Sequence, residues 1–383
     1  MIDFSLTPEQ EAIQKMAREF AQKEIAPVAD EYDRSGEYPE AVVRKAFEAE
    51  LVYGSIPEEY GGGGVGALDQ LIAVEELSAA CAGISACIAI NSLAAIPLVL
   101  RGSEEQKKKY LGTICREEKK MALCVTEPEA GSDVASITTS ARKLNGEYVI
   151  SGSKCFITNG GVADYYIVFA SVDRSKGHRG ITAFIVPREA EGVSVGKRED
   201  KMGQRAADTT DVSFDEVKVP LAARIGEEGE GFRIIMQTFN HSRPGVAASA
   251  VGVARAALDH ALNYSLQRSQ FGIPIFMQQS IMFMLADMAR DITAGRLLAW
   301  KAGWMAEQGI DNSAEAAMAK VFCGDMVMRA TTDAVQVYGG YGYVKDYPVE
   351  KLMRDAKVFQ IYEGTSQVQR LLIGRALAKA KMS

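Results

Sequence analysis

One carboxylate near the C-terminal end of the chain lies in the segment "QIYEGTSQ", residues 360–367. Glu363 stands there between a tyrosine and a glycine, and it is either a solvated loop charge or a general base. The segment that follows favours a base at a helix entrance, because Thr365 is a suitable N-cap and apolar residues recur at helical spacing after it. A carboxylate held there against an apolar pocket has its pKa raised by desolvation, which suits proton abstraction.

Three other motifs could bind a ligand, but each also has an ordinary structural interpretation. "LCVTEPEAGSD", residues 123–133, predicts a strand that leads into a loop with the hydroxyls of Thr126 and Ser132. "QRSQFG", residues 267–272, predicts a helix terminus, and "QVYGGYGY", residues 336–343, predicts a helix that ends at glycines. None of these motifs assigns a function when it is considered alone.

Composition narrows the classes of function. The 383 residues carry a net charge of −7 with a pI near 5.3, so no general attraction to nucleic acid or an anionic membrane is expected. Six cysteines are scattered without a CxxC pair, and only three histidines are present, which indicates neither a disulfide framework nor a metal site. The first residues are acidic where a targeting peptide would be basic, and this favours a cytoplasmic protein.

The elements that must position these motifs fall into three blocks. Residues 1–120 read as helices, beginning with a capping box formed by Thr7 and Gln10 around Pro8. Residues 121–227 contain β-branched and aromatic runs cut by turns, such as "EYVISGSKCFIT" and "GITAFIVP", and predict a β domain. Residues 228–383 return to long helical periodicities and predict a helical bundle. The chain is thus a multidomain α+β protein, and without βαβ units or a GxGxxG motif a Rossmann nicotinamide site is not supported.

The run from Cys81 to Leu100 carries no formal charge and is long enough to span a bilayer. Against a membrane span stand the polar residues Asn91 and Ser92 and the proline Pro97 within the run. We therefore expect a helix in the protein interior and no membrane insertion.

Taken together and in this order, the motifs resemble the acyl-CoA dehydrogenase family of FAD flavoproteins, closest to its short- and medium-chain members. The resemblance covers nearly the whole chain. It rests on "TEPEAGSD" (126–133), "FITNGG" (156–161), "KMGQRAADT" (201–209), "QRSQFG", "QVYGGYGY" and "MRDAKVFQIYEGTSQVQR" (353–370). It implies an N-terminal helical domain, a central β-barrel-like domain and a C-terminal four-helix bundle.

The resemblance also implies an FAD site between the β domain and the C-terminal bundle. The positions that match flavin contacts of the family are Leu123, Val125, Thr126, Ser132, Phe156, Thr158, Thr365 and Gln367. The pyrophosphate and adenine end is expected to be held by a neighbouring subunit of a homotetramer, a dimer of dimers. The positions that match that end are Arg268, Gln270, Phe271, Gln279, Gln336, Gly339 and Gly340. Phe156 stands where tryptophan is common, but it keeps an aromatic face.

By the same resemblance, Glu363 matches the base that removes an α-proton of the acyl thioester while a hydride leaves the β-carbon for flavin N5. The positions that match substrate contacts are Ser132, Asn240, Arg243, Tyr362 and Gly364. Asn240 stands where medium-chain members carry an acidic residue. Some relatives carry the base on a bundle helix, at a position that here is Ser242, so Glu363 is the candidate that remains.

The charge-free run also limits the expected substrate. It offers no cation to a second carboxylate, which disfavours a glutaryl-type substrate. Ile88 and Ile90 would shorten the acyl cavity toward short, medium or compact cyclic acyl groups. The expected electron acceptor is an electron-transferring flavoprotein. An acyl-CoA oxidase and a non-catalytic helical scaffold that has lost the flavin are the alternatives.

Overall fold

The N-terminal part is helical, as predicted, in a computed structural model that describes residues 4–382. Its helices are α1 (Pro8–Phe20), α2 (Ala29–Ser35), α3 (Glu40–Glu48), α4 (Ala67–Ala80), α5 (Ala82–Arg101), α6 (Glu104–Gln106) and α7 (Gly112–Arg116). The capping box at the start of α1 is confirmed, because the Thr7 side chain accepts from the Gln10 backbone and the Gln10 side chain accepts from the Thr7 backbone. Residues 61–66 form an irregular loop before α4.

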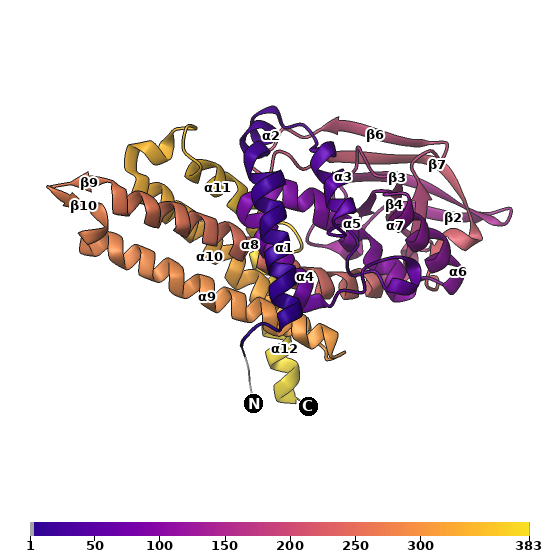
Figure 1. The fold of residues 1–383 in the computed structure, drawn as a ribbon. Coiled ribbons are helices and arrows are strands. Elements are labelled where there is room, and N and C mark those ends of the chain that lie inside the picture. Colours follow the sequence, from indigo (N-terminus) through magenta and orange to yellow (C-terminus); the bar gives the residue numbers. More distant parts are fainter. Residues whose placement is uncertain (1–3, 383) are drawn as a thin grey trace.

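The middle of the chain forms an eight-stranded mixed sheet. Its strands are β1 (Met121–Cys124), β2 (Ser140–Leu144), β3 (Glu147–Thr158), β4 (Tyr165–Ser171), β5 (Ile181–Pro187), β6 (Val193–Arg198), β7 (Thr209–Pro220) and β8 (Arg224–Ile225). The order is β6-β7-β3-β2-β4-β5-β8, and β1 pairs with β4 in parallel. The twelve-residue strands β3 and β7 pair along their length and are interrupted by irregular registers. Figure 1 shows this sheet at the end of the molecule opposite the hairpin of β9 (Ser269–Gln270) and β10 (Ile273–Pro274).

The C-terminal part is a helical bundle. Its elements are α8 (Gly231–Gln267), β9 (Ser269–Gln270), β10 (Ile273–Pro274), α9 (Gln279–Glu307), α10 (Ser313–Tyr338), α11 (Val349–Ala356) and α12 (Ser366–Met382). The short hairpin β9–β10 lies at the tip of the bundle, where α8 gives way to α9 (Figure 1). Small residues dominate the bundle core, with many fully buried alanines on α8 and α10 that let the helices approach closely.

Helix α5 is the charge-free run of the sequence. By length and composition it could cross a membrane, but just over half of its apolar window is buried within the protein. It packs on α4, α8 and β1. Asn91 is fully buried, where its side chain donates to the Cys87 carbonyl and accepts from the Met121 amide. Such a satisfied amide is typical of an interior helix.

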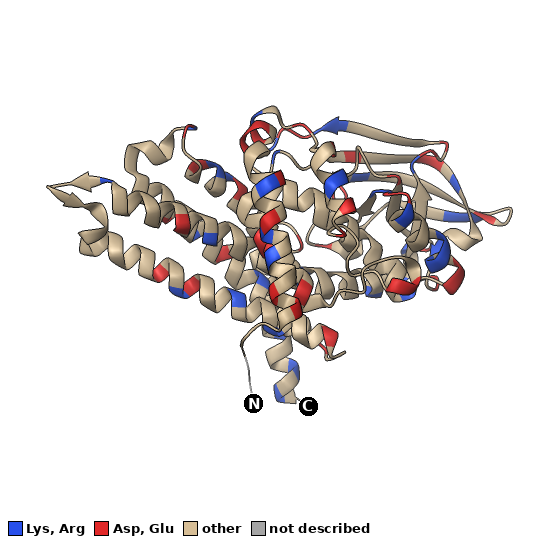
Figure 2. Cartoon of the chain, viewed as in Figure 1, with Lys and Arg blue, Asp and Glu red and all other residues tan. Residues whose placement is uncertain are grey.

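Buried ion pairs join the N-terminal helices to the bundle. Glu76 of α4 is 3% exposed and forms ion pairs with Arg18 of α1 at 2.9 Å and Arg255 of α8 at 2.7 Å. Its neighbour Glu75 pairs with Arg296 of α9 at 2.8 Å. Figure 2 shows basic and acidic residues interspersed along the chain.

A second set of charges joins all three parts. Arg354 of α11 pairs with Asp33 of α2 at 2.7 Å and donates to the carbonyl of Met202, which precedes β7. The next residue, Asp355, is fully buried and accepts from the backbone amide of Gln204. The relative placement of helices and sheet around the site therefore depends on α11.

The cysteines are unpaired, and five of the six are buried. Cys115 is only partly buried. Among the described residues no group of histidines, cysteines and carboxylates is arranged to hold a metal ion.

Candidate active site

Glu363 lies in a tight turn between α11 and α12. Its φ is +55° and that of Gly364 is +90°, so two consecutive residues adopt left-handed backbone conformations. This conformation disfavours L side chains and is typical of functional sites where the surroundings hold it in place. Thr365 then begins α12 as predicted, because its hydroxyl accepts from the amide of Val368 at 3.2 Å.

The Glu363 carboxylate has one neutral hydrogen-bond donor from the bundle. The Ser242 hydroxyl, on α8, donates to Oε2 at 2.7 Å. Ser242 was of interest in the sequence only because it is not a carboxylate. The structure gives it a direct contact with the candidate base, across 121 positions of sequence.

Three donors from three helices hold the carbonyls of this turn. Nε of Arg243, on α8, donates to the Glu363 carbonyl at 3.2 Å. Nζ of Lys320, on α10, donates to the Gly364 carbonyl at 2.7 Å. Nε2 of Gln369, on α12, reaches both carbonyls, at 3.1 and 2.9 Å. The left-handed turn is therefore fixed by side chains and not by a local backbone ladder.

Burial raises the pKa of Glu363. The hydrogen bond from Ser242 and the positive charges of Arg243 and Lys320 act against that rise. Burial in turn lowers the pKa of Lys320 to about 8, although Glu363 opposes this. A carboxylate with a raised pKa, balanced by two nearby cations, can accept a proton near neutral pH.

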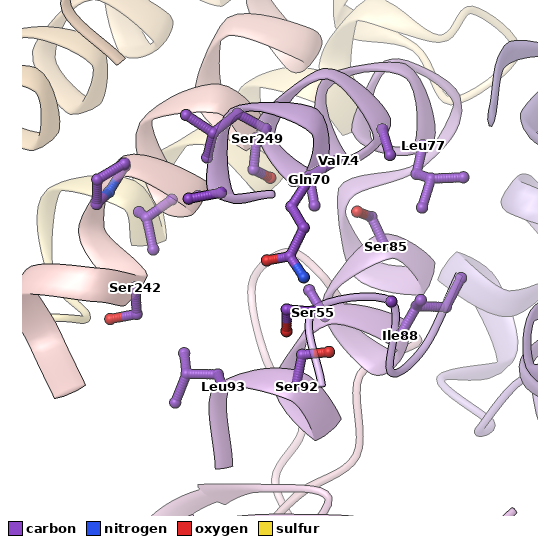
Figure 3. Close-up of a pocket in the computed structure, with 18 of the residues that line it drawn as sticks. Ser55, Gln70, Val74, Leu77, Ser85, Ile88, Ser92, Leu93, Ser242 and Ser249 are labelled. Carbon is purple, nitrogen blue, oxygen red and sulfur yellow. The ribbon is translucent and has the colours of Figure 1, made fainter. Parts of the chain in front are cut away.

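Glu363, Ser242 and Tyr362 line a mostly apolar cavity of about 260 Å³. The cavity runs between α4, α5 and α8, and both Ile88 and Ile90 of α5 lie on its wall. Figure 3 shows this space, with Ser242 at one side and a group of polar side chains deeper in it. The labelled members of that group are Ser55, Gln70, Ser85, Ser92 and Ser249.

The predicted flavin contacts of the β domain lie on β1, on the loop after it and at the end of β3. The loop is fastened to β3, because the Cys155 amide donates to the Thr126 carbonyl and the Lys154 ammonium donates to the Val125 carbonyl, both at 3.0 Å. Lys154 also forms a fully buried ion pair with Glu127 at 2.8 Å. The loop backbone is thus held in one position.

Phe156 and Thr158 form the edge of this region nearest the cavity. Phe156 has a φ of +57° and is 67% exposed, an unusual state for a phenylalanine at the end of a strand. Thr158 lines the same cavity as Glu363. An exposed aromatic face beside a hydroxyl and a fixed loop is what a planar, partly polar ring system such as an isoalloxazine requires, so these residues fit the flavin.

A second cavity, of about 1080 Å³, lies at the far tip of the bundle. It gathers five of the seven residues predicted for the distal end of the cofactor, namely Arg268, Gln270, Phe271, Gly339 and Gly340. Gln279 and Gln336 are exposed nearby but do not line it. The Arg268 guanidinium lies 5.7 Å from the centre of the Tyr341 ring, and both residues line this cavity.

The structure brings the predicted substrate residues together only in part. Arg243, Tyr362 and Gly364 surround Glu363, and Asn240 accepts from Nη1 of Arg243 at 3.2 Å. Ser132 and Gln367 are exposed and line neither cavity.

Two contacting residues were missed by the sequence analysis, Lys320 and Gln369. Lys320 carried a usable signal, because it is a lone charge on the apolar face of "AAMAKVF". Gln369 carried none, since a glutamine in the first turn of a helix is ordinary.

Comparison with known proteins identifies the fold over nearly the whole chain. Family models described as the N-terminal, middle and C-terminal domains of acyl-CoA dehydrogenase match residues 7–118, 122–217 and 229–378. A protein of Clostridium acetobutylicum named "Acyl-CoA dehydrogenase, short-chain specific" is 44% identical over 97% of this chain and 98% of its own length.

Two solved structures have the same fold as this chain. The butyryl-CoA dehydrogenase of Megasphaera elsdenii superposes with a TM-score of 0.96 at 44% identity, over 98% of this chain and all of that one. A chain in a structure described as the electron transferring flavoprotein of Acidaminococcus fermentans, on flavin-based electron bifurcation, gives a TM-score of 0.96 at 45% identity, over 98% of this chain and 99% of that one.

Proposed function

This chain belongs to the acyl-CoA dehydrogenase family of oxidoreductases, and we propose that it removes two hydrogens from a short- or medium-chain acyl-CoA thioester to give the trans-2-enoyl-CoA. The observation that carries the proposal is the Glu363 carboxylate, which lines an apolar cavity and accepts from Ser242, in a turn whose backbone carbonyls accept from Arg243 and Lys320. Glu363 is the base for the α-proton.

The turn at Glu363 supplies more than a carboxylate. An α-proton is too weakly acidic for a carboxylate without help, so donors must stabilise the charge that develops on the thioester oxygen. The backbone amide of Glu363 is proposed as one such donor, in an orientation set by the left-handed turn. Tyr362 and Gly364 would flank the reacting carbons, and Arg243 lies beside Gly364.

FAD is the proposed cofactor, and when bound it supplies the acceptor for the hydride that leaves the β-carbon. Thr158 and Phe156 would hold the ring system, and the loop from Val125 to Ser132 would contribute backbone and hydroxyl contacts, with Leu123 of β1, Thr365 and Gln367 beside them. The residues at the tip of the bundle would hold the pyrophosphate and adenine of a cofactor in a neighbouring subunit. The fixed loop and the exposed Phe156 support this assignment.

The size of the cavity supports a compact substrate. About 260 Å³ bounded by Ile88 and Ile90 suits short, medium or compact cyclic acyl groups. Rates across a ladder of acyl-CoA lengths test this, and a maximum at sixteen carbons or more would contradict it.

A homotetramer and an electron-transferring flavoprotein complete the proposal. The exposed aromatic residues Phe271 (95% exposed) and Tyr343 (88% exposed) near the second cavity support burial against another subunit. The mass in solution, by light scattering, tests the tetramer. A cytoplasmic location stays a prediction.

The central test is a visible spectrum of the purified protein, followed by anaerobic titration with butyryl-, octanoyl- and cyclohexanecarboxyl-CoA. We expect flavin absorption that bleaches on addition of substrate. Glu363→Gln should keep the flavin and lose nearly all bleaching, and a fully active Glu363→Gln enzyme would refute the base. Absence of flavin bands even with added FAD would favour a non-catalytic scaffold, and peroxide formed at the rate of turnover would favour an oxidase.

A further inference from the structure

Lys320 is a buried lysine that contacts the backbone of Gly364, the residue after the proposed base Glu363. Its side chain lies on the inner face of α10 and is 1% exposed. The contact of its ammonium is with the Gly364 carbonyl and not with a carboxylate. A buried ammonium without a close counter-ion is costly, so its place in the bundle calls for a reason beyond packing.

The backbone carbonyls of the turn that Lys320 contacts accept hydrogen bonds from side chains. Glu363 and Gly364 both have positive φ, which turns their carbonyls away from the backbone pairing of the adjacent helices. The donors that reach these carbonyls are the side chains of Arg243, Lys320 and Gln369. Gln369 belongs to α12, which directly follows the turn, whereas Arg243 and Lys320 belong to α8 and α10, two long helices of the core. These two cations therefore fasten the turn to the rest of the bundle.

We propose that Lys320 is a positioning residue for Glu363: its ammonium anchors the left-handed turn so that the carboxylate faces the acyl cavity. Its positive charge also favours the ionised form of that carboxylate. This inference rests on the proposed function, in which Glu363 is the base. Lys320 itself touches neither the cavity nor the reacting atoms.

The positive charge of Lys320 lowers the pKa of Glu363. The charged and titratable groups around the turn are Arg243 and His241 on α8, Lys320 and Asp325 on α10, Tyr362 in the turn and Arg370 on α12. Of these, Arg243 and Lys320 lower the pKa of Glu363, against burial, which raises it. Removal of the Lys320 charge leaves burial less opposed, so the pKa of Glu363 rises. The base is then protonated up to a higher pH, and the acid limb of the rate profile moves in the alkaline direction.

The test measures kcat for butyryl-CoA against pH in the flavin-loaded enzyme and in two variants. Lys320→Met removes both the charge and the donor, and Lys320→Gln removes the charge but keeps a donor. We expect both to shift the acid limb upward by about one pH unit, as for loss of one opposite charge at close range. Lys320→Met should also lower the plateau kcat by roughly 10- to 100-fold, because the carboxylate is misplaced. Lys320→Gln should recover part of that plateau.

Lys351→Met is the matched control. Lys351 is another lysine of the C-terminal part whose side chain is only 13% exposed, but it pairs with Asp355 at 2.6 Å, donates to Cys81 at 3.4 Å and has no contact with Glu363 or Gly364. Its loss should lower the melting temperature and leave the acid limb where it is in the wild type.

A wild-type pH profile in both Lys320 variants would overturn the proposal. An equal shift of the acid limb in Lys351→Met would also overturn it. If Lys320→Met does not retain flavin, the pH profile of Lys320→Gln alone tests the proposal, and an unshifted acid limb there overturns it. The proposed function is judged separately by Glu363→Gln: an active Glu363→Gln enzyme refutes the base itself, whereas an inactive one together with unshifted Lys320 variants refutes only the role of Lys320.

Discussion

Replacement of Lys154 by methionine should destabilise the protein, because it leaves the buried carboxylate of Glu127 without its counter-ion. Lys154 and Glu127 form an ion pair with both side chains at 2% exposure or less. Glu127 also accepts from the amide and hydroxyl of Thr138 and the amide of Thr139, so its charge is fully satisfied only with Lys154 in place. Loss of one partner strands a buried charge beside the loop that carries Val125 and Thr126.

The size of the effect follows from the pKa of Glu127. Burial alone raises that pKa, but the Lys154 charge and the hydrogen bonds outweigh burial and bring it to about 2. A drop from the ordinary value of 4.5 to about 2 corresponds to about 3 kcal/mol of stability. Breaking a buried pair by removal of one partner costs a similar amount, about 3–5 kcal/mol. In the wild type this stability is complete above pH 4.5 and is lost as pH falls toward 2.

The assay is thermal unfolding of the holoenzyme in excess FAD, so that cofactor binding contributes equally to each protein. A loss of about 3 kcal/mol predicts a melting temperature roughly 4 °C below wild type at pH 8, because the entropy of unfolding scales with the 383 residues of the chain. Without Lys154, burial raises the pKa of Glu127 above its unfolded value, so protonation relieves the defect and the gap narrows as pH falls to 5.

Two comparisons isolate the cause. Lys143→Met removes an exposed lysine of β2 that lies 3.5 Å from Glu228, which is also exposed, and it should change the melting temperature by no more than about 1 °C. The double change Glu127→Gln with Lys154→Met should be milder than Lys154→Met alone, because no charge is stranded. A Lys154→Met enzyme as stable as wild type, or a gap that does not depend on pH, would refute the reasoning.

Three further predictions concern the turn at Glu363 and the ion pair between Arg354 and Asp33. Ser242→Ala removes a hydrogen bond that lowers the pKa of Glu363, so the acid limb of kcat should move about one pH unit upward, and an unshifted pH profile would contradict this. Gly364→Ala places a side chain at a φ of +90° and a Cβ 2.6 Å from Gln369 Nε2, so kcat at the pH optimum should fall at least about tenfold with little change in flavin content. Arg354→Ala strands Asp33 and should lower stability by about 3 kcal/mol, which thermal unfolding measures; Arg354→Lys should retain part of it.

Local patterns were enough to predict the elements that carry strong periodicity. The capping box of α1 and the strands β3, β4, β5 and β7 follow from residue types within a few positions of one another. Strand β2 was not predicted, because three of its five residues are exposed and it shows no alternation. Its pairing with β3 depends on contacts that a short window does not contain.

The candidate site was predictable where the chemistry is local in sequence. Tyr362, Glu363, Gly364 and Thr365 are consecutive, and the structure brings them to the cavity or to the start of α12. The supports of the turn are not local: Ser242 and Lys320 lie 121 and 44 positions from the residues they contact. Only the packing of α8 and α10 on the turn reveals them.

Helix α8 spans 37 residues, with Ser242 about a third of the way along it and Arg268 just beyond its C-terminal end, about 39 Å apart along its axis. This separation exceeds the reach of one dinucleotide, so on the proposed assembly each chain contributes halves of two different active sites. A chain damaged at Glu363 and a chain damaged at Arg268 would then each lack a different half. Mixed in one oligomer, they would restore some intact sites, and two inactive alleles would complement each other.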